Sequence, residues 1–361
     1  MKLLWFGVLL CVSDSLVTID SRIRVDSRIP VNSLTHYRQY RNGKNPLIPK
    51  STYPFITKKN PINLKFQESK IDGFIQLIRP KSILPTFLLS FSGAWLIHPS
   101  FTDLAHSTSF IISSITTLLV MSSAMVINDI YDLPIDKINH PKRPLVSKKV
   151  SVIEAILLYA TMNLLTEGLS LYFLPEYLQP IIHLSILYVG LYTPIFKKIP
   201  LVKNAACAGL VSFSILFSGM STSGNTLISL NPNFDLFSNL LVMIFLGSLC
   251  NELLLDIRDY QGDKENRIYT IPVIFGKPFA WFFANMVAYF NLFFSGNVLI
   301  YNTNMTNGLL WFLMFSPILK NLYRIKQEDY SYDSITKTLK DNNTSLFTVI
   351  LFLCSIAGTR L

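Results

Sequence analysis

The sequence contains little charge. Only 15% of its 361 residues are Asp, Glu, Lys or Arg, whereas about 25% is usual in a soluble globular domain. Half of the residues are hydrophobic, and they occur in long runs that short polar connections separate. This pattern argues against a soluble enzyme of two domains and predicts a single integral-membrane unit.

Cysteine is also scarce, and its spacing carries no motif. The four cysteines, Cys11, Cys207, Cys250 and Cys354, are far apart and include no CxxC pair. Three of them lie inside apolar runs. The sequence therefore gives no evidence of a disulfide framework or a zinc site, and we interpret these side chains as small buried groups in helices.

A nucleic-acid-binding signature is missing as well, although the net charge is +10. The bases lie in the N-terminal segment and in the short connections, and no basic helix is interleaved with aromatic residues. The charge is better explained by membrane topology, so we expect no nucleic-acid partner.

The N-terminal segment has the composition of a targeting sequence. Residues 3–13 form an apolar stretch that is too short to span a bilayer and is typical of a signal-peptide core. Residues 21–60 then carry nine Lys or Arg against the single acid Asp26. We interpret residues 1–70 as a targeting segment and 71–361 as the membrane domain. Two-step import into a plastid is slightly favoured, with a mitochondrial or secretory address as the alternative.

The apolar runs predict an all-α, polytopic membrane protein of about nine transmembrane helices around a central cavity. The predicted spans are residues 83–97, 109–128, 151–170, 179–193, 205–222, 236–255, 279–300, 308–321 and 344–359. The connections after even-numbered spans contain several Lys or Arg, whereas those after spans one, three, five and seven contain none. This alternation supports both the number of spans and their orientation.

Two aspartate motifs follow the second and sixth spans, both on the basic side. The triplets are Asp129, Asp132 and Asp136, and Asp256, Asp259 and Asp263. Both have the spacing i, i+3, i+7, which places the carboxylates on one face of a continuing helix. We expect Pro134 and Gly262 to bend or end these helices.

Three acids on one face repel one another unless a cation lies among them. Mg²⁺ prefers oxygen ligands and is commonly held by one or two carboxylates while it bridges to substrate phosphates. Two such clusters at the same depth predict two metal positions with a diphosphate between them. The alternative is that the acids are solvated helix ends that balance nearby bases, but identical spacing in both motifs favours the metal site.

The bases near the motifs are candidates for neutralising phosphate oxygens. Arg143, between Lys142 and Pro144, is the first of them, because its guanidinium can make two parallel hydrogen bonds to a phosphate. Positive-inside topology would also place bases in these connections.

Both motifs resemble those of a known family. NDIYDLPIDKINHPKRPL resembles the NDxxDxxxD signature and the following RPL of the UbiA superfamily of intramembrane prenyltransferases. ELLLDIRDYQGDKENRIYTIPVIFGK resembles the second segment of that family, DxxDxxGD. The resemblance covers residues 71–361. One departure is Val146 to Lys149, where many relatives have a Ser-Gly pair.

The resemblance implies a helical fold whose central cavity is open to lipid and capped by the loops that carry the motifs. It also implies that Mg²⁺ on the aspartates holds an isoprenyl diphosphate. The expected metal ligands are Asp129, Asp132, Asp136, Asp256, Asp259 and Asp263, of which Asp129, Asp132 and Asp259 are expected to be catalytic. The expected substrate-binding residues are Asn128, Lys137, Arg143, Tyr192, Lys197, Lys198, Arg258 and Lys264.

The implied activity is transfer of the isoprenyl group to an acceptor within the membrane. A quinone-precursor aromatic such as homogentisate or a hydroxybenzoate, the tetrapyrrole of chlorophyll, and a glycerol phosphate lipid are all candidate acceptors. The alternatives are an ion-coupled multi-pass transporter and a noncatalytic lipid-binding scaffold. Transporter sites tend to lie near the bilayer midplane, whereas the acids inside the spans are few, with Glu154 and Glu167 as exceptions.

Overall fold

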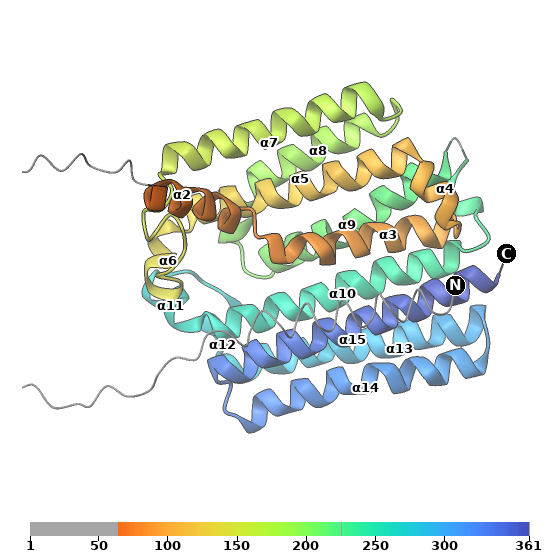
Figure 1. Ribbon diagram of the computed structural model, residues 1–361. Coiled ribbons are helices and arrows are strands. Elements are labelled where there is room, and N and C mark those ends of the chain that lie inside the picture. Colours follow the sequence, from red (N-terminus) through yellow and green to blue (C-terminus); the bar gives the residue numbers. More distant parts are fainter. Residues whose placement is uncertain (1–63, 225, 361) are drawn as a thin grey trace, which may run out of the picture. The chain divides into compact units, whose positions relative to one another are not determined.

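Helices make up every regular element of the part of the chain that the structure describes, residues 64–224 and 226–360 of a computed structural model (Figure 1). No strand occurs in these ranges. Nearly all of the predicted targeting segment, 1–70, lies outside the described residues. The helix α2 (Leu64–Leu77) crosses the predicted boundary at Ile71, so that boundary stays a prediction.

Nine helices coincide with the nine predicted spans to within a few residues, apart from α14 and α15, which begin or end well outside theirs. They are α3 (Ile83–Ile97), α5 (Thr108–Tyr131), α7 (Val152–Phe173), α8 (Gln179–Tyr192), α9 (Val202–Ser223), α10 (Phe234–Arg258), α13 (Lys277–Asn302), α14 (Met305–Gln327) and α15 (Tyr332–Thr359). Six of them, α5, α7, α9, α10, α13 and α15, are long and apolar enough to cross a bilayer. The helices α3 and α8 have only 15 and 14 residues, so the count of nine crossings is approximate.

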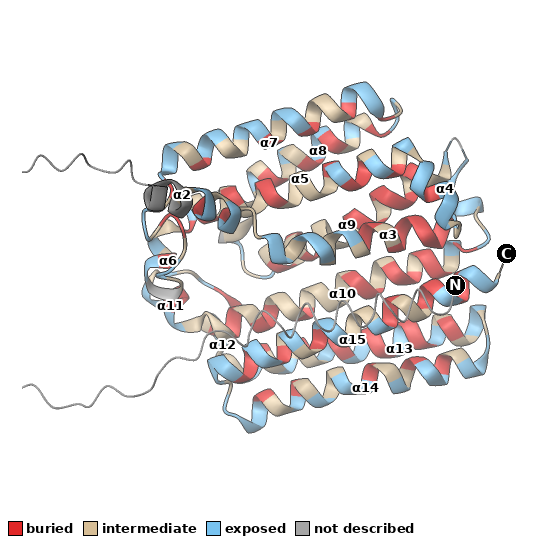
Figure 2. Ribbon diagram, viewed as in Figure 1, coloured by how far each residue is buried: buried red, intermediate tan, exposed pale blue. Residues whose placement is uncertain are grey.

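The outward side chains are those expected in lipid. Figure 2 shows exposed residues along the outer side of α7, where Leu164 is 73% and Tyr172 is 86% exposed. Large apolar groups with this exposure would be unfavourable in water. Helices that satisfy their own backbone hydrogen bonds and present apolar side chains outward are the structure that hydrocarbon requires. The protein is therefore an integral, multi-pass membrane protein.

The short helices gather at one end of the bundle. Figure 1 shows α2, α6 (Leu133–Asn139), α11 (Tyr260–Glu265) and α12 (Ile271–Phe275) together at this end, with α4 (Phe101–His106) at the other. Successive long helices run in opposite directions, so every connection after an even-numbered span reaches the end that holds α6 and α11. The basic connections and both aspartate motifs consequently share one end.

Each aspartate motif contains a kink at its middle carboxylate. The helix α5 ends at Tyr131 and α6 begins one residue after Asp132, whose φ and ψ are −81° and 0°. Asp259 separates α10 from α11 in the same way, with φ −90° and ψ 9°. The backbone N–H of Asp136 still donates to the carbonyl of Asp132 at 2.8 Å. The helices thus bend at the middle aspartates, before Pro134 and Gly262, where the sequence predicted the bends.

Candidate functional site

A cavity of about 480 Å³ lies between α3, α5, α8, α9 and α10 and extends to the end that carries the two motifs. Its lining changes in character along its length. Charged side chains surround the end near α6 and α11, and mostly apolar side chains, with a few Ser and Thr, line the remainder. The apolar lining includes Leu89, Val120, Met125, Val189, Leu210 and Phe217. We call the charged part the ionic cap and the remainder the apolar channel.

The first motif lies in a network of bases. Arg79 donates to Asp129 at 2.7 Å, and Arg143 donates to Asp129 at 3.0 Å and to Asp136 at 2.5 Å. Arg143 therefore joins the carboxylate at the end of α5 to the carboxylate on α6. Asp129 is only 3% exposed and lies behind the cavity lining, where it orients both guanidinium groups.

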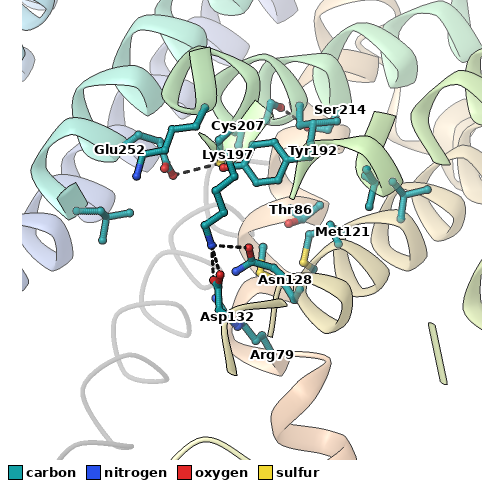
Figure 3. A pocket seen from close by; sticks show the side chains of 18 of the residues that line it. Arg79, Thr86, Met121, Asn128, Asp132, Tyr192, Lys197, Cys207, Ser214 and Glu252 are labelled. Atoms are coloured by element: carbon teal, nitrogen blue, oxygen red, sulfur yellow. Dashed lines mark hydrogen bonds and ion pairs between the residues drawn. The ribbon is translucent and has the colours of Figure 1, made fainter. Parts of the chain in front are cut away.

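Lys197 bridges two elements of the ionic cap. It belongs to the short 3-10 helix η2 (Phe196–Lys198), which connects α8 to α9. Figure 3 shows its ammonium group donating to the carboxylate of Asp132 and to the amide oxygen of Asn128, the latter at 3.1 Å. The η2 connection is thereby held against the end of α5.

The second motif is paired in the same manner. Lys203, at the start of α9, lies 2.6 Å from Asp256, which also accepts a hydrogen bond from Asn204 at 3.0 Å. Arg258 donates to both oxygens of its neighbour Asp259 at 2.9 and 3.0 Å. The first motif therefore pairs with a base from the connection between α8 and α9, Lys197, and the second with a base in the first turn of α9, Lys203.

Burial raises the pKa of two carboxyl groups on the short helices. The pKa of Asp136 rises to about 6 even though Arg143 lowers it, and the pKa of Asp263 rises to about 6 even though Lys203 lowers it. Burial penalises the ionised form. Neighbouring aspartates raise both values further. Both carboxyl groups are thus protonated more readily than an exposed aspartate.

Most of the chain matches a known protein family. Residues 83–357 match the model of the UbiA prenyltransferase family, which is more than half of the chain. The chain belongs to the UbiA prenyltransferase family. The resemblance that the two motifs carry in the sequence is therefore confirmed.

Individual relatives of this UbiA protein agree with that assignment. A digeranylgeranylglyceryl phosphate synthase of Sulfolobus acidocaldarius is 29% identical over 252 residues, which are 69% of this chain and 81% of that protein. A solved structure described as digeranylgeranylglyceryl phosphate synthase in membranes has a TM-score of 0.58 at 23% identity and covers 80% of this chain and 99% of its own. A UbiA homolog from Archaeoglobus fulgidus bound to GPP and Mg²⁺ has a TM-score of 0.58 at 17% identity, with the same coverage. These structural similarities establish the fold.

Most of the site residues predicted from the sequence meet at the cavity of this UbiA protein. Those that line it are Asn128, Asp132, Asp136, Arg143, Tyr192, Lys197, Asp256, Arg258, Asp259 and Asp263. Asp129 lies just behind them. Lys137 and Lys264 are exposed outside the cavity lining, and Lys264 lies 5.6 Å from the ring centroid of Tyr260. The side chain of Lys198 falls outside the described residues.

Sequence reasoning missed three residues of the ionic cap. Arg79 immediately precedes η1 (Pro80–Ser82) and has a left-handed conformation with φ 51°, and Lys203 lies in a connection that the sequence identified only as basic. Both line the cavity, as does His140. Burial, followed by the nearby Arg143, lowers the pKa of His140, which favours the neutral ring.

Glu252 is the fourth missed residue, and it corrects the statement on acids inside the spans. It lies within the predicted span 236–255, one helical turn before Asp256, so Glu154 and Glu167 are not the only exceptions. The thiol of Cys207 donates to its carboxylate at 3.2 Å, and Figure 3 shows this pair beside Tyr192 and Lys197. Both residues line the cavity where the ionic cap meets the apolar channel. The sequence signal was an acid four residues before a motif aspartate.

The donor atoms of the ionic cap fit Mg²⁺. Within the described ranges, no three Asp, Glu, His or Cys side chains converge closely enough to form a complete metal cage. Mg²⁺ does not require one, because it usually takes one or two carboxylates and completes its octahedron with waters and substrate phosphates. The two triplets supply hard oxygen donors from two sides of one cavity.

Proposed function

We propose that this UbiA protein catalyses the Mg²⁺-dependent transfer of an isoprenyl group from an allylic prenyl diphosphate to an acceptor within the membrane. One observation carries the proposal: both aspartate motifs border a single cavity that continues as an apolar channel. The ionic cap suits a diphosphate, and the channel suits its hydrocarbon chain. The family assignment and the homolog bound to GPP and Mg²⁺ support the same activity.

The ionic cap binds and orients the diphosphate. Mg²⁺, held by carboxylates of the two motifs, would withdraw charge from the diphosphate and so promote cleavage of the allylic C–O bond. Lys197 and Lys203 place two ammonium groups at the entrance of the channel, where the leaving group accumulates negative charge. Arg143 and Arg258 add guanidinium groups suited to phosphate oxygens. Such preorganised charges are usually the largest contribution to catalysis.

The apolar channel protects the allylic cation from water. Most of its lining consists of Leu, Val, Met and Phe side chains, which offer no nucleophile to the cation, and the hydroxyl group of Ser214 donates to the backbone carbonyl of Val211. Tyr192, beside Lys197 (Figure 3), presents an aromatic face that can stabilise a cation by about 0.5–2 kcal/mol. Asp129 would act as a positioning residue, since it holds Arg79 and Arg143 from behind the lining.

Among the candidate acceptors, we favour a lipid that carries a glyceryl phosphate. The relatives named digeranylgeranylglyceryl phosphate synthase support this choice, because that name describes a prenylated glyceryl phosphate. A quinone-precursor aromatic and a tetrapyrrole are the competing acceptors, and the experiment below separates all three.

The decisive assay incubates membranes that contain the protein with radiolabelled geranylgeranyl diphosphate and one acceptor from each class, with Mg²⁺ or with EDTA. We expect a product with a glyceryl phosphate acceptor only when Mg²⁺ is present. Asp132→Ala and Asp259→Ala should each abolish the product. Asp333→Ala, an exposed site at the same end of the bundle, is the matched control and should retain it.

Two outcomes would contradict the proposal. Full activity of both motif variants would refute the role of the metal and the diphosphate. Failure of folded protein to bind the diphosphate in Mg²⁺ would instead favour the ion-coupled transporter or the lipid-binding scaffold.

We further propose that residues 1–70 direct the protein to an organelle membrane, with a plastid slightly favoured over a mitochondrion. The basic, acid-poor composition of residues 21–60 supports this proposal. A fusion of residues 1–70 to a fluorescent protein should localise to that organelle, and a purely cytosolic signal would refute any targeting role.

A further inference from the structure

The apolar channel ends against four side chains from four helices. The deepest lining residues are Leu89 on α3, Thr117 on α5, Ile182 on α8 and Phe217 on α9. Phe217 is the largest of them and is only 2% exposed. Its ring is nearly parallel to that of Phe213, with the centroids 6.4 Å apart. We call these four residues the channel floor.

Beyond the floor, the helices approach one another too closely to leave further space. Ser113 and Ser221 lie one turn beyond the floor on α5 and α9, and their buried hydroxyl oxygens are 2.9 Å apart. A Cβ added to Gly93 on α3 would lie 2.9 Å from the Cα of Ile215, which is two residues nearer the cap than Phe217 on α9, so these two backbones are in contact beside the floor. Small residues permit such approaches between membrane helices. They seal the channel beneath Phe217.

The depth of the channel follows from helical geometry. On α5, eleven residues separate Asn128 in the ionic cap from Thr117 in the floor, which corresponds to about 16 Å at the helical rise per residue. On α9, fourteen residues separate Lys203 from Phe217, which corresponds to about 21 Å. The distance from the cap to the floor is therefore about 16 to 21 Å.

This depth can be compared with the length of an isoprenoid. An extended chain advances about 1.2 Å per backbone bond, since a residue of three bonds spans about 3.5 Å. An isoprene unit adds four bonds, or about 5 Å, so the four units of a geranylgeranyl group span about 20 Å. Such a group fills the channel to its floor. A fifth isoprene unit would meet Phe217.

We infer that Phe217 sets the upper limit of prenyl chain length in this protein. The inference rests on the proposed function, since it assumes that the channel holds the prenyl chain of the donor. The next turn of α9 beyond Phe217 lies about 6 Å deeper, which is close to the length of one isoprene unit. Removing the ring therefore creates space for one additional unit.

The test measures transfer from donors of three, four and five isoprene units in competition. For the wild type, kcat/KM should be at least about tenfold lower with five units than with four, because a pocket discriminates by about this factor per small group. Phe217→Ala should abolish this difference. Ser214→Phe introduces a ring about 4.5 Å nearer the cap, so it should shift the preference from four units to three. Ser214 lines the same channel (Figure 3).

The matched control is Phe237→Ala on α10. Phe237 is fully buried and contacts α9 at Gly219, but it does not line the cavity. This variant loses the same ring and should keep the wild-type preference. If both channel variants transfer with the wild-type preference, Phe217 does not set chain length and the inference fails.

A different result would contradict the proposed function itself. If the wild type transfers no donor of any length, the proposed function fails independently of Phe217. If Phe217→Ala is inactive with every donor, Ser214→Phe decides: a shift toward three units supports the inference, and an unchanged preference overturns it.

Discussion

Replacing Lys197 with Met should destabilise the metal-free protein and make it more dependent on Mg²⁺. The ammonium group of Lys197 contacts both oxygens of Asp132 and the amide oxygen of Asn128. The side chains of Lys197 and Asp132 are only 21% and 11% exposed. Methionine keeps the apolar stem but leaves the carboxylate of Asp132 without its charged partner.

The size of the effect follows from this burial. Breaking a buried ion pair by removing one partner costs roughly 3–5 kcal/mol. Because Asp132 keeps a small contact with solvent, we expect the lower value, about 3 kcal/mol, which is more than a hundredfold in the folding equilibrium. Mg²⁺ at about 100 times its Kd would stabilise the folded state by about 2.7 kcal/mol. That gain would offset most of the loss.

The assay is thermal unfolding in detergent, with EDTA or with a Mg²⁺ titration. We expect a lower Tm for Lys197→Met in EDTA and a larger rise in its Tm with Mg²⁺ than in the wild type, where the ammonium group competes with the metal for Asp132. Lys337→Met, at an exposed position outside the cavity, is the control and should behave as the wild type. Equal stabilisation of Lys197→Met and the wild type by Mg²⁺ would refute the reasoning.

Three further predictions concern the ionic cap and the helix packing. Arg143→Lys should lower kcat/KM for prenyl transfer by about tenfold or more, because Nη1 of Arg143 alone joins Asp129 and Asp136 and lysine lacks the second guanidinium nitrogen that can bind a phosphate oxygen. Unchanged kinetics would contradict this. The affinity for Mg²⁺ should fall as the pH decreases through about 6, because burial raises the pKa of Asp136 and Asp263 to about 6 and a protonated carboxyl group is a poor ligand. Calorimetric titrations on either side of that pH measure the change. An affinity that does not depend on pH would contradict this prediction. Gly93→Ala should destabilise the fold by about 1–3 kcal/mol, because the added methyl group would lie 2.9 Å from the Cα of Ile215. Thermal unfolding in detergent measures this loss of stability. An unchanged Tm would show that α3 and α9 can separate.

The sequence predicts the long helices well for a physical reason. In hydrocarbon, a chain has to satisfy its own backbone hydrogen bonds, so a long apolar run can form little other than a helix. The helix α3 matches its predicted span, 83–97, residue for residue. The final span, 344–359, was predicted too short, because α15 begins at Tyr332. Its first turns carry polar and charged residues that no apolar window detects.

The motif geometry was predicted less completely. Equal spacing placed three carboxylates on one face of a straight helix, whereas both helices bend at the middle aspartate. Proline and glycine are the breakers that a sequence reveals, and here they lie after the bend. Asp132 adopts its conformation beside Lys197 from another connection, a contact that exists only in the folded protein, whereas Asp259 pairs with its own neighbour Arg258.

The cavity residues that the sequence did not reveal are also brought together only by packing. Arg79, Lys203 and Glu252 belong to three segments that are distant in the sequence, and only Glu252 lies in a segment that carries a motif. Arg79 reaches Asp129 across 50 positions, and Asn204, beside Lys203, reaches Asp256 across 52. Topology alone accounts for the bases Arg79 and Lys203, so only packing reveals that they face the same cavity as Glu252.

The charge balance of the ionic cap links its structure to the order in which ligands bind. Among the described residues at the cap, seven acids face five permanent bases. The acids are Asp129, Asp132, Asp136, Asp256, Asp259, Asp263 and Glu252, and the bases are Arg79, Arg143, Lys197, Lys203 and Arg258. A diphosphate that arrived without metal would increase this excess of negative charge inside a weakly polar cavity, where repulsion is strong. Divalent cations reverse the balance, and by linkage the diphosphate must in turn increase the affinity for metal. The arrangement therefore favours a substrate that binds together with its Mg²⁺, and it keeps the bases bound to aspartates until that complex arrives.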